Sequence, residues 1–491
     1  MKIKEFYNKY YPNNTIFYNH SINKITDNSK EVEQNDVFIA VKGYNHDGHD
    51  YIKEAIENGA KTIIINEERI FNSSSVNIIR SKNTQKDLSR ILNMFYDSFY
   101  SKRPKFIGVT GTNGKTTITT ITYEYLKQIN KDVLLIGTNG IKSYFGLNEK
   151  TYSSVNTTPK LTIIFKHLMS VPISYDYVIM EVSSQGISEG RILGLNFDVV
   201  LINNLTEEHL DYHQNMENYR DVKGSLISSV SQNSNAIVIL NVNQKEFAYF
   251  NNLNTNQNIY YGIKNKDYFN LNEINYEILE QNINETTFNL YINKEEHLCT
   301  TNLIGDFNIE NLTAAMAIIK SLNLFTSYFF NYIKKIPNID GRLNRLKYNN
   351  RYFLIDFAHN SKAVEKTLKL LNKIKINNII TVIGCGGNRD FEKRPIMGNL
   401  ALTYSDYVIF TEDNPRFENT IDIINDMLKG NIKVNYEIIE NRKEAIFKAY
   451  QLSKENDFIV ILGKGAESYI IKNDFKIPYS DLETVKSIIN E

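Results

Sequence analysis

Short apolar runs alternate with amphipathic, helix-like segments along most of the chain. The rhythm is clearest after about residue 336, where "YFLIDF", "IITVIG", "DYVIF" and "DFIVILG" have strand length and "KAVEKTLKLLNKI" and "TIDIINDMLKG" lie between them. Apolar strands that alternate with helices are typical of a mostly parallel sheet covered on both faces. The pattern therefore predicts an α/β protein.

The alternation falls into three blocks, and 491 residues are too many for one ordinary core. Residues 1–100 contain "DVFIAVKG" and "KTIIIN"; residues 101–335 open with "KFIGVT" and include polar, strand-like stretches such as "TTFNLYI"; residues 336–491 carry the regular rhythm described above. From the length we expect two to four domains, and the limits of these blocks are the candidate boundaries.

Polar clusters follow the predicted strands where each strand ends. They are "GTNGKTT", "EVSSQ", "NNLTEEH", "DFAHN", "GCGGNRD", "TEDNPR" and "GKGAES". Ligands of parallel α/β sheets bind at the carboxyl ends of the strands. These clusters are therefore the candidate functional residues.

"GVTGTNGKTT" lies between a predicted strand and a predicted helix, which is the context of a phosphate-binding loop. Lys115 can reach the terminal phosphates of a nucleotide, and the Thr116 hydroxyl can bind Mg²⁺. The strict motif has glycine where Val109 stands, and a simple glycine turn before a lysine is the alternative interpretation. The strand–loop–helix order favours the phosphate loop, formed by Gly111, Thr112, Asn113, Gly114, Lys115, Thr116 and Thr117.

Two further strand ends carry side chains suited to a metal. Glu181 follows "YDYVIM", and His209 follows "VVLINN". Mg²⁺ prefers oxygen ligands, so Glu181 is an ordinary ligand and His209 a less ordinary one. Either residue alone is more often structural, and the phosphate loop upstream favours the metal. Lys223 has the local pattern of a surface lysine.

Composition excludes several classes of protein. The 56 basic residues equal the 56 acidic ones, so nothing favours nucleic-acid binding. The chain shows no signal peptide and no membrane-spanning run, and its two cysteines make no disulfide or metal pattern. We expect a cytoplasmic monomer without membrane insertion.

Ten motifs occur in the order found in the Mur ligases, the ATP-dependent enzymes that build the peptide of the bacterial cell-wall precursor, and the chain resembles that family over nearly its whole length. They are "TGTNGKTT", "NTTP", "EVSSQ", "NLTEEHLDYH", "GDFNIEN", "GRLNRL", "DFAHNSKA", "GCGGNRDFEKRP", "DNPRFE" and "GKGAESY". The resemblance implies an N-terminal domain for the UDP end of the substrate, a central phosphate-loop ATPase and a C-terminal Rossmann-like domain.

The resemblance also implies roles for individual residues. Lys115 and Thr116 would bind ATP, and Thr116, Glu181, His209 and a carbamylated Lys223 would hold Mg²⁺. Asn308, Arg342, Asp356 and His359 would complete the nucleotide site. Contacts to the UDP-muramoyl-dipeptide would come from Ser29, Thr157, Thr158, Ser183 and Arg191, and contacts to the incoming amino acid from Arg389, Asp413, Asn414, Arg416, Gly463 and Glu467.

The reaction of this family joins a carboxylate to an amine through an acyl phosphate. Both steps gather negative charge, so positioned cations supply most of the stabilisation. Lys115, Lys223 and His209 would be the catalytic residues. The proton of the attacking amine would pass to His209 or to a metal-bound carboxylate, and the sequence does not decide between them.

"DNPR" would select the free diamino acid. Arg416 would grip the distal carboxylate of meso-2,6-diaminopimelate, which L-lysine lacks. A proline turn in which Arg416 pairs with Asp413 is the structural alternative. Ala466 and Asn388 differ from the residues common in the family near this pocket, which leaves lysine or a lanthionine-like amino acid open.

Two other functions remain as alternatives. Folylpolyglutamate synthetase shares the phosphate loop, but it lacks a block like residues 1–100. A regulatory switch that binds ATP without ligation would not need the set formed by Glu181, His209 and Lys223.

Overall fold

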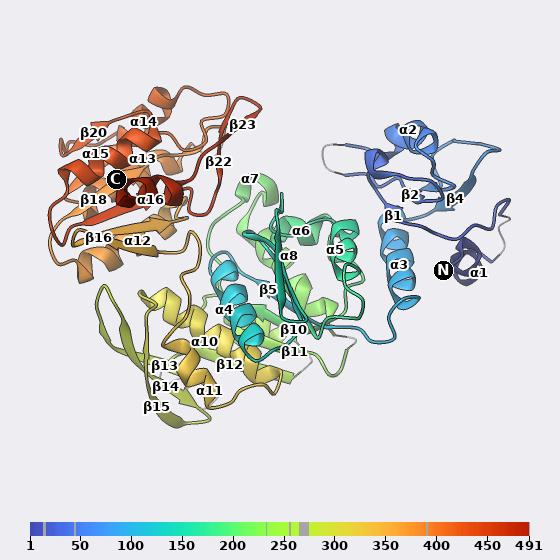
Figure 1. Ribbon diagram of the computed structural model, residues 1–491, viewed down its shortest axis with the longest axis horizontal. Coiled ribbons are helices and arrows are strands. Elements are labelled where there is room, and N and C mark those ends of the chain that lie inside the picture. The colour runs from blue at the N-terminus through green and yellow to red at the C-terminus, as the bar shows by residue number, and fades with distance from the viewer. Residues whose placement is uncertain are drawn as a thin grey trace. The chain divides into compact units, whose positions relative to one another are not determined.

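The computed structural model describes residues 1–12, 16–43, 46–231, 233–254, 257–264, 274–388 and 391–490. The chain divides into two compact units, and Figure 1 shows its course. The first unit comprises Met1–Thr206, Asn215–Tyr260 and Ala317–Asn323, and the second comprises Glu207–Gln214, Tyr261–Met316 and Leu324–Glu491. The domain boundaries near residues 100 and 335 stay a prediction.

The first unit begins with a small parallel sheet of order β1-β2-β3-β4. Its strands are β1 (Ile25–Thr26), β2 (Val37–Ile39), β3 (Thr62–Asn66) and β4 (Asn77–Ser81). The helices of this region are α1 (Ile3–Tyr10), α2 (Ile52–Glu57) and α3 (Thr84–Asp97), with short 3₁₀ turns at Ser29–Glu31 and Gly48–Tyr51. Asn83 caps α3 by accepting a bond from the Lys86 backbone N–H at 2.8 Å.

Neighbouring strands of a larger sheet lie in the same unit in the order β11-β10-β5-β9-β6-β7-β8. Its strands are β5 (Lys105–Thr110), β6 (Val133–Gly137), β7 (Gly140–Phe145), β8 (Asn148–Tyr152), β9 (Tyr177–Glu181), β10 (Phe197–Ile202) and β11 (Ile237–Asn241). All pairs are parallel except the β6-β7-β8 meander. The helices are α4 (Lys115–Gln128), α5 (Leu161–Leu168), α6 (Ser184–Ser188), α8 (Met216–Ser229) and α9 (Phe247–Asn252).

The second unit contains an antiparallel segment and a mostly parallel sheet. β13 (Ile274–Gln281), β14 (Thr286–Ile292) and β15 (Glu295–Thr301) are antiparallel, and Tyr261–Ile263 of β12 (Gln257–Ile263) pair in parallel with β13. The other sheet has the order β16-β17-β21-β18-β19-β20, and only the β16–β17 pair is antiparallel.

The strands of that second sheet are β16 (Asn344–Tyr348), β17 (Arg351–Asp356), β18 (Ile379–Ile383), β19 (Tyr407–Phe410), β20 (Tyr436–Ile438) and β21 (Phe458–Leu462), and β22 (Tyr469–Lys472) with β23 (Phe475–Pro478) forms a hairpin. The helices are α7 (Leu210–His213), α10 (Asp306–Ser321), α11 (Tyr328–Ile333), α12 (Ser361–Ile374), α13 (Lys393–Tyr404), α14 (Thr420–Leu428), α15 (Arg442–Leu452) and α16 (Asp481–Asn490). Residues of α12, α13 and α14 share one apolar cluster with the sheet, and residues of α15 and α16 share another.

The predicted α/β class is confirmed, and the sheet rhythm after residue 336 is observed as strands covered by helices. "KFIGVT" coincides with β5 and "TTFNLYI" with β14. No helix among the described residues has the length and apolar character needed to cross a membrane.

Candidate active site

The phosphate loop connects β5 to α4, as predicted. Gly114 is the N-cap of α4 with φ +89°, and Gly111 has φ +151°, two backbone conformations that favour glycine. The Lys115 ammonium donates to the backbone carbonyls of Gly111 at 2.8 Å and Thr112 at 2.9 Å. The lysine therefore lies over the loop that carries it, at the N-terminus of a helix where phosphate is favoured.

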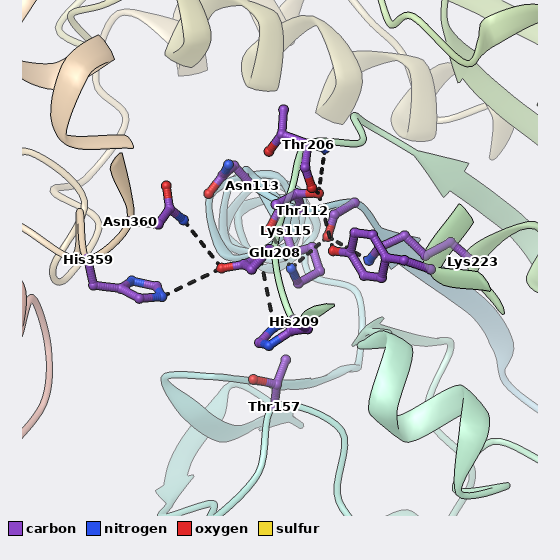
Figure 2. A network of polar contacts seen from close by, with 12 residues as sticks. Thr112, Asn113, Lys115, Thr157, Thr206, Glu208, His209, Lys223, His359 and Asn360 are labelled. Carbon is purple, nitrogen blue, oxygen red and sulfur yellow. Dashed lines mark hydrogen bonds and ion pairs between the residues drawn. The ribbon is translucent and has the colours of Figure 1, made fainter. Parts of the chain in front are cut away.

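The loop following β10 holds the phosphate loop in place. The Asn204 side chain accepts the backbone N–H of Asn113 at 2.9 Å, and the Asn203 amide donates to the Asn113 carbonyl at 3.0 Å. Thr112 and Thr206 exchange two bonds, in which the Thr112 hydroxyl donates to the Thr206 carbonyl and accepts from its N–H (Figure 2). The sequence marks "NNLTEEH" as a polar cluster but does not predict these three partners individually.

Thr116 and Glu181 are brought together at the predicted metal site. The Thr116 hydroxyl donates to the Glu181 carboxylate at 3.0 Å, and Thr138 adds bonds from its N–H and its hydroxyl, each at 3.0 Å. Glu181 is buried at the end of β9. A hydroxyl and a buried carboxylate are hard oxygen ligands, so the residues present fit Mg²⁺.

Lys223 lies inside the molecule, so the surface position indicated by its local pattern is wrong. Its side chain is 1 % exposed, and its ammonium donates to the Gly111 carbonyl at 3.0 Å and the Thr110 hydroxyl at 3.4 Å. The ammonium also lies 4.8 Å from the ring centre of Tyr219. Tertiary packing of α8 against the strand end thus places Lys223 beside the phosphate loop.

Four of the residues assigned to the muramoyl-dipeptide gather beside Glu181. The Thr157 and Thr138 hydroxyls are 3.0 Å apart, and the Thr158 hydroxyl donates to the Glu181 carbonyl at 2.9 Å. Ser183 donates its N–H to Thr158 at 2.9 Å, and Arg191 donates to the Thr158 carbonyl at 2.9 Å.

Ser29, assigned to the uridine, lies in the N-terminal region of the same unit. Its hydroxyl donates to the Glu54 carboxylate at 2.5 Å. Nearby, Asp27 pairs with the Lys160 ammonium at 2.7 Å and accepts from the Thr162 hydroxyl at 2.8 Å. This contact joins the segment that carries Ser29 to the segment that follows Thr158.

In the second unit, Glu208 connects two predicted motifs. Its carboxylate lies 3.6 Å from Nε2 of His359, accepts from the Asn360 amide at 3.3 Å, and lies 3.9 Å from Nε2 of His209 (Figure 2). Nδ1 of His359 carries a proton, because its partner 2.8 Å away is the Phe357 carbonyl, which can only accept. The Nε2 contact with Glu208 is therefore an ion pair when the imidazole is fully protonated.

The remaining residues assigned to the nucleotide include Asp356 in β17, its neighbour Arg342, and Asn308 in α10. Asp356 ends β17 and accepts backbone bonds from Leu343 at 2.8 Å and Ala358 at 3.0 Å. Burial raises the pKa of Asp356, and the neighbouring Arg342 opposes that shift. Asn308 is buried in α10 and donates to the Ile304 carbonyl at 2.8 Å.

The strand ends at β19 and β21 form the candidate amino-acid pocket. Oδ2 of Asp413 is buried with no hydrogen-bond partner in the described protein. The side-chain amide of Asn414 donates to Glu467 at 2.9 Å, and its Oδ1 accepts from the Lys464 ammonium at 3.1 Å and the Ile471 N–H at 2.9 Å. Lys464 is fully buried and lies 3.0 Å from Glu467. Lys464 is not among the residues predicted from the sequence for this site.

Arg416 and Gly463 complete this set. The Arg416 guanidinium donates to the carbonyls of Gly387 at 2.8 Å and Asn414 at 3.3 Å. Gly463 faces Asp413, because a Cβ at position 463 would lie 2.5 Å from Oδ2 of Asp413. Arg389, which was also assigned to the amino acid, lies outside the described residues.

Comparison with known proteins shows one family along the chain. The Mur ligase family catalytic domain matches residues 21–96, the Mur ligase middle domain residues 109–319, and the Mur ligase glutamate ligase domain residues 341–465. The chain belongs to the Mur ligase family, and it is therefore an ATP-dependent ligase.

The most informative relatives are matched over nearly their whole length. A UDP-N-acetylmuramyl-tripeptide synthetase 2 of Oceanobacillus iheyensis is 35% identical over 96% of this chain and 95% of its own. A UDP-N-acetylmuramoyl-L-alanyl-D-glutamate–2,6-diaminopimelate ligase of Aquifex aeolicus is 36% identical over 95% and 93%. A solved structure of a ligase with that second name has a TM-score of 0.67 and 25% identity, and covers 99% of this chain and 98% of its own.

Proposed function

We propose that the enzyme joins meso-2,6-diaminopimelate to UDP-N-acetylmuramoyl-L-alanyl-D-glutamate, in an ATP-dependent step of peptidoglycan precursor synthesis. The observation that carries this proposal is a loop that offers both a cation and an anion. The Arg416 guanidinium donates to the Gly387 carbonyl, and the buried Oδ2 of Asp413 has no hydrogen-bond partner among the described residues. The names of the similar ligases support the same substrates.

The pocket matches the charges of a diamino acid with two carboxylates. A buried carboxylate oxygen without a donor is costly, and a substrate ammonium would satisfy Oδ2 of Asp413. The bonds of Arg416 to two backbone carbonyls orient its planar guanidinium before substrate arrives. A charge-assisted bond contributes about 1.5–3 kcal/mol, or roughly ten- to a hundredfold in selectivity over lysine.

Glu467 is a second candidate acceptor for a substrate ammonium. Asn414 and Lys464 both donate to Oε2 of Glu467, at 2.9 and 3.0 Å, and so fix its position. Asn414 already bonds Lys464, Ile471 and Glu467. We therefore propose that Asn414 orients Glu467, and that the substrate ammonium groups bind directly to Asp413 and Glu467.

At the phosphate loop, Lys115 would turn from the Gly111 and Thr112 carbonyls to the ATP phosphates. Thr116 and Glu181 would hold Mg²⁺, and Lys223, once carbamylated, would add an anion for a second ion. Mg²⁺ would supply neutralisation of the charge that gathers on the transferring phosphoryl group.

The D-glutamate carboxylate of the substrate would take the γ-phosphoryl group of ATP and release ADP. The amine of diaminopimelate would then displace phosphate from the acyl phosphate to form the amide. We also propose that the enzyme acts as a monomer. We place the reaction in the cytoplasm, where ATP and nucleotide-linked precursors are available.

The test is an incubation of purified protein with ATP, Mg²⁺ and UDP-N-acetylmuramoyl-L-alanyl-D-glutamate, with meso-diaminopimelate, L-lysine or lanthionine supplied in turn. Mass spectrometry of the nucleotide product should show the diaminopimelate adduct with one ADP formed per adduct. Preferential formation of the lysine adduct would contradict the proposed specificity. ATP hydrolysis without any adduct would contradict ligation itself.

A further inference from the structure

The candidate amino-acid pocket is built on two strands that do not touch. Strand β18 lies between β21 and β19 in the sheet, so β21 and β19 share no backbone hydrogen bonds with each other. Asp413 lies three residues after Phe410, the last residue of β19. Gly463 directly follows Leu462, the last residue of β21. The sheet therefore links Asp413 and Gly463 only indirectly, through β18, and leaves room for a direct link between the two strand ends.

Arg442 supplies a direct link between these two strand ends. It is fully buried at the first position of α15. Its guanidinium donates to the Glu412 carbonyl at 3.2 Å and to the Leu462 carbonyl at 2.9 Å. Each of these carbonyls belongs to the residue immediately before Asp413 or Gly463.

The other edge of the guanidinium is anchored on the C-terminal helix. Nε and Nη2 of Arg442 donate to the two carboxylate oxygens of Asp481, at 2.8 and 2.9 Å, and Asp481 is also fully buried. Tyr479 donates its hydroxyl to Oδ1 of Asp481 at 2.9 Å. A buried, bidentate pair with further hydrogen bonds fixes the guanidinium in one orientation.

We infer that Arg442 is a positioning residue of the ligase, which sets the separation of Asp413 and Gly463 and thereby the affinity for the incoming amino acid. The inference rests on the proposed function. Gly463 approaches Oδ2 of Asp413 so closely that a Cβ there would lie 2.5 Å away. A small displacement of either strand end therefore changes the space and the acceptors that the substrate ammonium meets.

Lysine at position 442 keeps the charge but has one ammonium, which cannot reach two carbonyls and both oxygens of Asp481 in the same plane. Arg442→Lys should raise the KM for meso-diaminopimelate about tenfold or more, because misplacement of a binding group by a fraction of an ångström is felt strongly. The KM values for ATP and for the UDP substrate should change less than twofold, since Arg442 bonds Glu412, Leu462 and Asp481, none of which is assigned to either substrate.

Leu371→Ala is the matched control for lost stability. Leu371 is fully buried in α12 of the same unit, away from α15. The alanine variant should lower the Tm without any selective change in the KM for diaminopimelate. If Leu371→Ala and Arg442→Lys raise all three KM values alike, Arg442 acts through stability alone and the inference is wrong.

Tyr479→Phe gives a second, milder perturbation, because it removes only the hydroxyl that supports Asp481. We expect a smaller increase in the same KM, about two- to fivefold, with the other KM values unchanged. If Arg442→Lys fails to fold, Tyr479→Phe is the test of the inference. An unchanged KM for diaminopimelate in that variant would then overturn it. Adduct formation by the wild-type enzyme tests the proposed function separately, because it does not depend on either variant.

Discussion

Replacement of Gly137 by alanine tests whether the position of the Glu181 carboxylate matters. Gly137 ends β6, which is paired with β9 on one side and β7 on the other, so the backbone has little room to move. An alanine Cβ would lie 2.8 Å from Cδ of Glu181 and closer still to Oε1. The carboxylate would therefore have to shift.

The size of the effect follows from the contacts that Glu181 makes. Restoring an ordinary carbon–carbon distance requires a shift of roughly 1 Å. Glu181 accepts three bonds from Thr116 and Thr138, each at 3.0 Å, and the loss of one such bond to a charged group costs about 1.5–3 kcal/mol. A displacement of about 1 Å at a catalytic centre also costs roughly a hundredfold in rate. We expect kcat/KM to fall by that factor, and the Mg²⁺ concentration for half-maximal rate to rise.

Phosphate release measured over a Mg²⁺ titration gives both quantities, and denaturant unfolding gives the stability. Gly146→Ala is the control, because its Cβ would meet nothing within 4 Å although φ is +55°. That variant should lose about 1–2 kcal/mol of stability from backbone strain and keep its Mg²⁺ dependence. A Gly137→Ala enzyme with wild-type kcat/KM and Mg²⁺ dependence would refute the assignment of Glu181.

Two single substitutions and one double-mutant cycle test the phosphate loop, Lys223 and the Asp27–Lys160 contact. Lys115→Ala should abolish ATP turnover while circular dichroism stays unchanged, and normal phosphate release from the folded variant would exclude the phosphate-loop role. Lys223→Ala should be nearly inactive and partly rescued by high acetate, which supplies the missing anion; wild-type rates without acetate would remove Lys223 from the mechanism. In the Asp27–Lys160 pair, the Asp27 side chain is buried and the Lys160 side chain is more than half exposed. A double-mutant cycle of unfolding free energies should therefore give a coupling of about 0.5–1 kcal/mol. The absence of measurable coupling would mean that the contact does not hold the two segments together.

The sequence predicted those parts of the site whose residues are neighbours in the chain. The phosphate loop needs only a strand end, two glycines and the start of a helix, and all of these lie within "KFIGVTGTNGKTT". The fold class was predictable for a similar reason, because apolar runs and helix patterns are local features. "KFIGVT" and "TTFNLYI" therefore matched β5 and β14 residue for residue.

The parts that escaped prediction are pairs distant in sequence. Glu208 contacts His359 and Asn360 across some 150 positions, and Arg442 contacts Asp481 across 39. Local pattern also placed Lys223 at the surface, because an isolated lysine in a polar helix is usually solvated, whereas packing of α8 buries it. Such contacts depend on the topology of the sheet, which a hydrophobic pattern does not specify.

The most direct test of the central claim is the ratio of kcat/KM for meso-diaminopimelate to kcat/KM for L-lysine, measured in wild type and in Arg416→Ala. We predict that wild type favours diaminopimelate and that the ratio falls about ten- to a hundredfold in the variant, since only diaminopimelate uses the guanidinium. Lysine kinetics should hardly change. A wild-type enzyme that prefers lysine, or a ratio that is the same in both enzymes, would contradict the account.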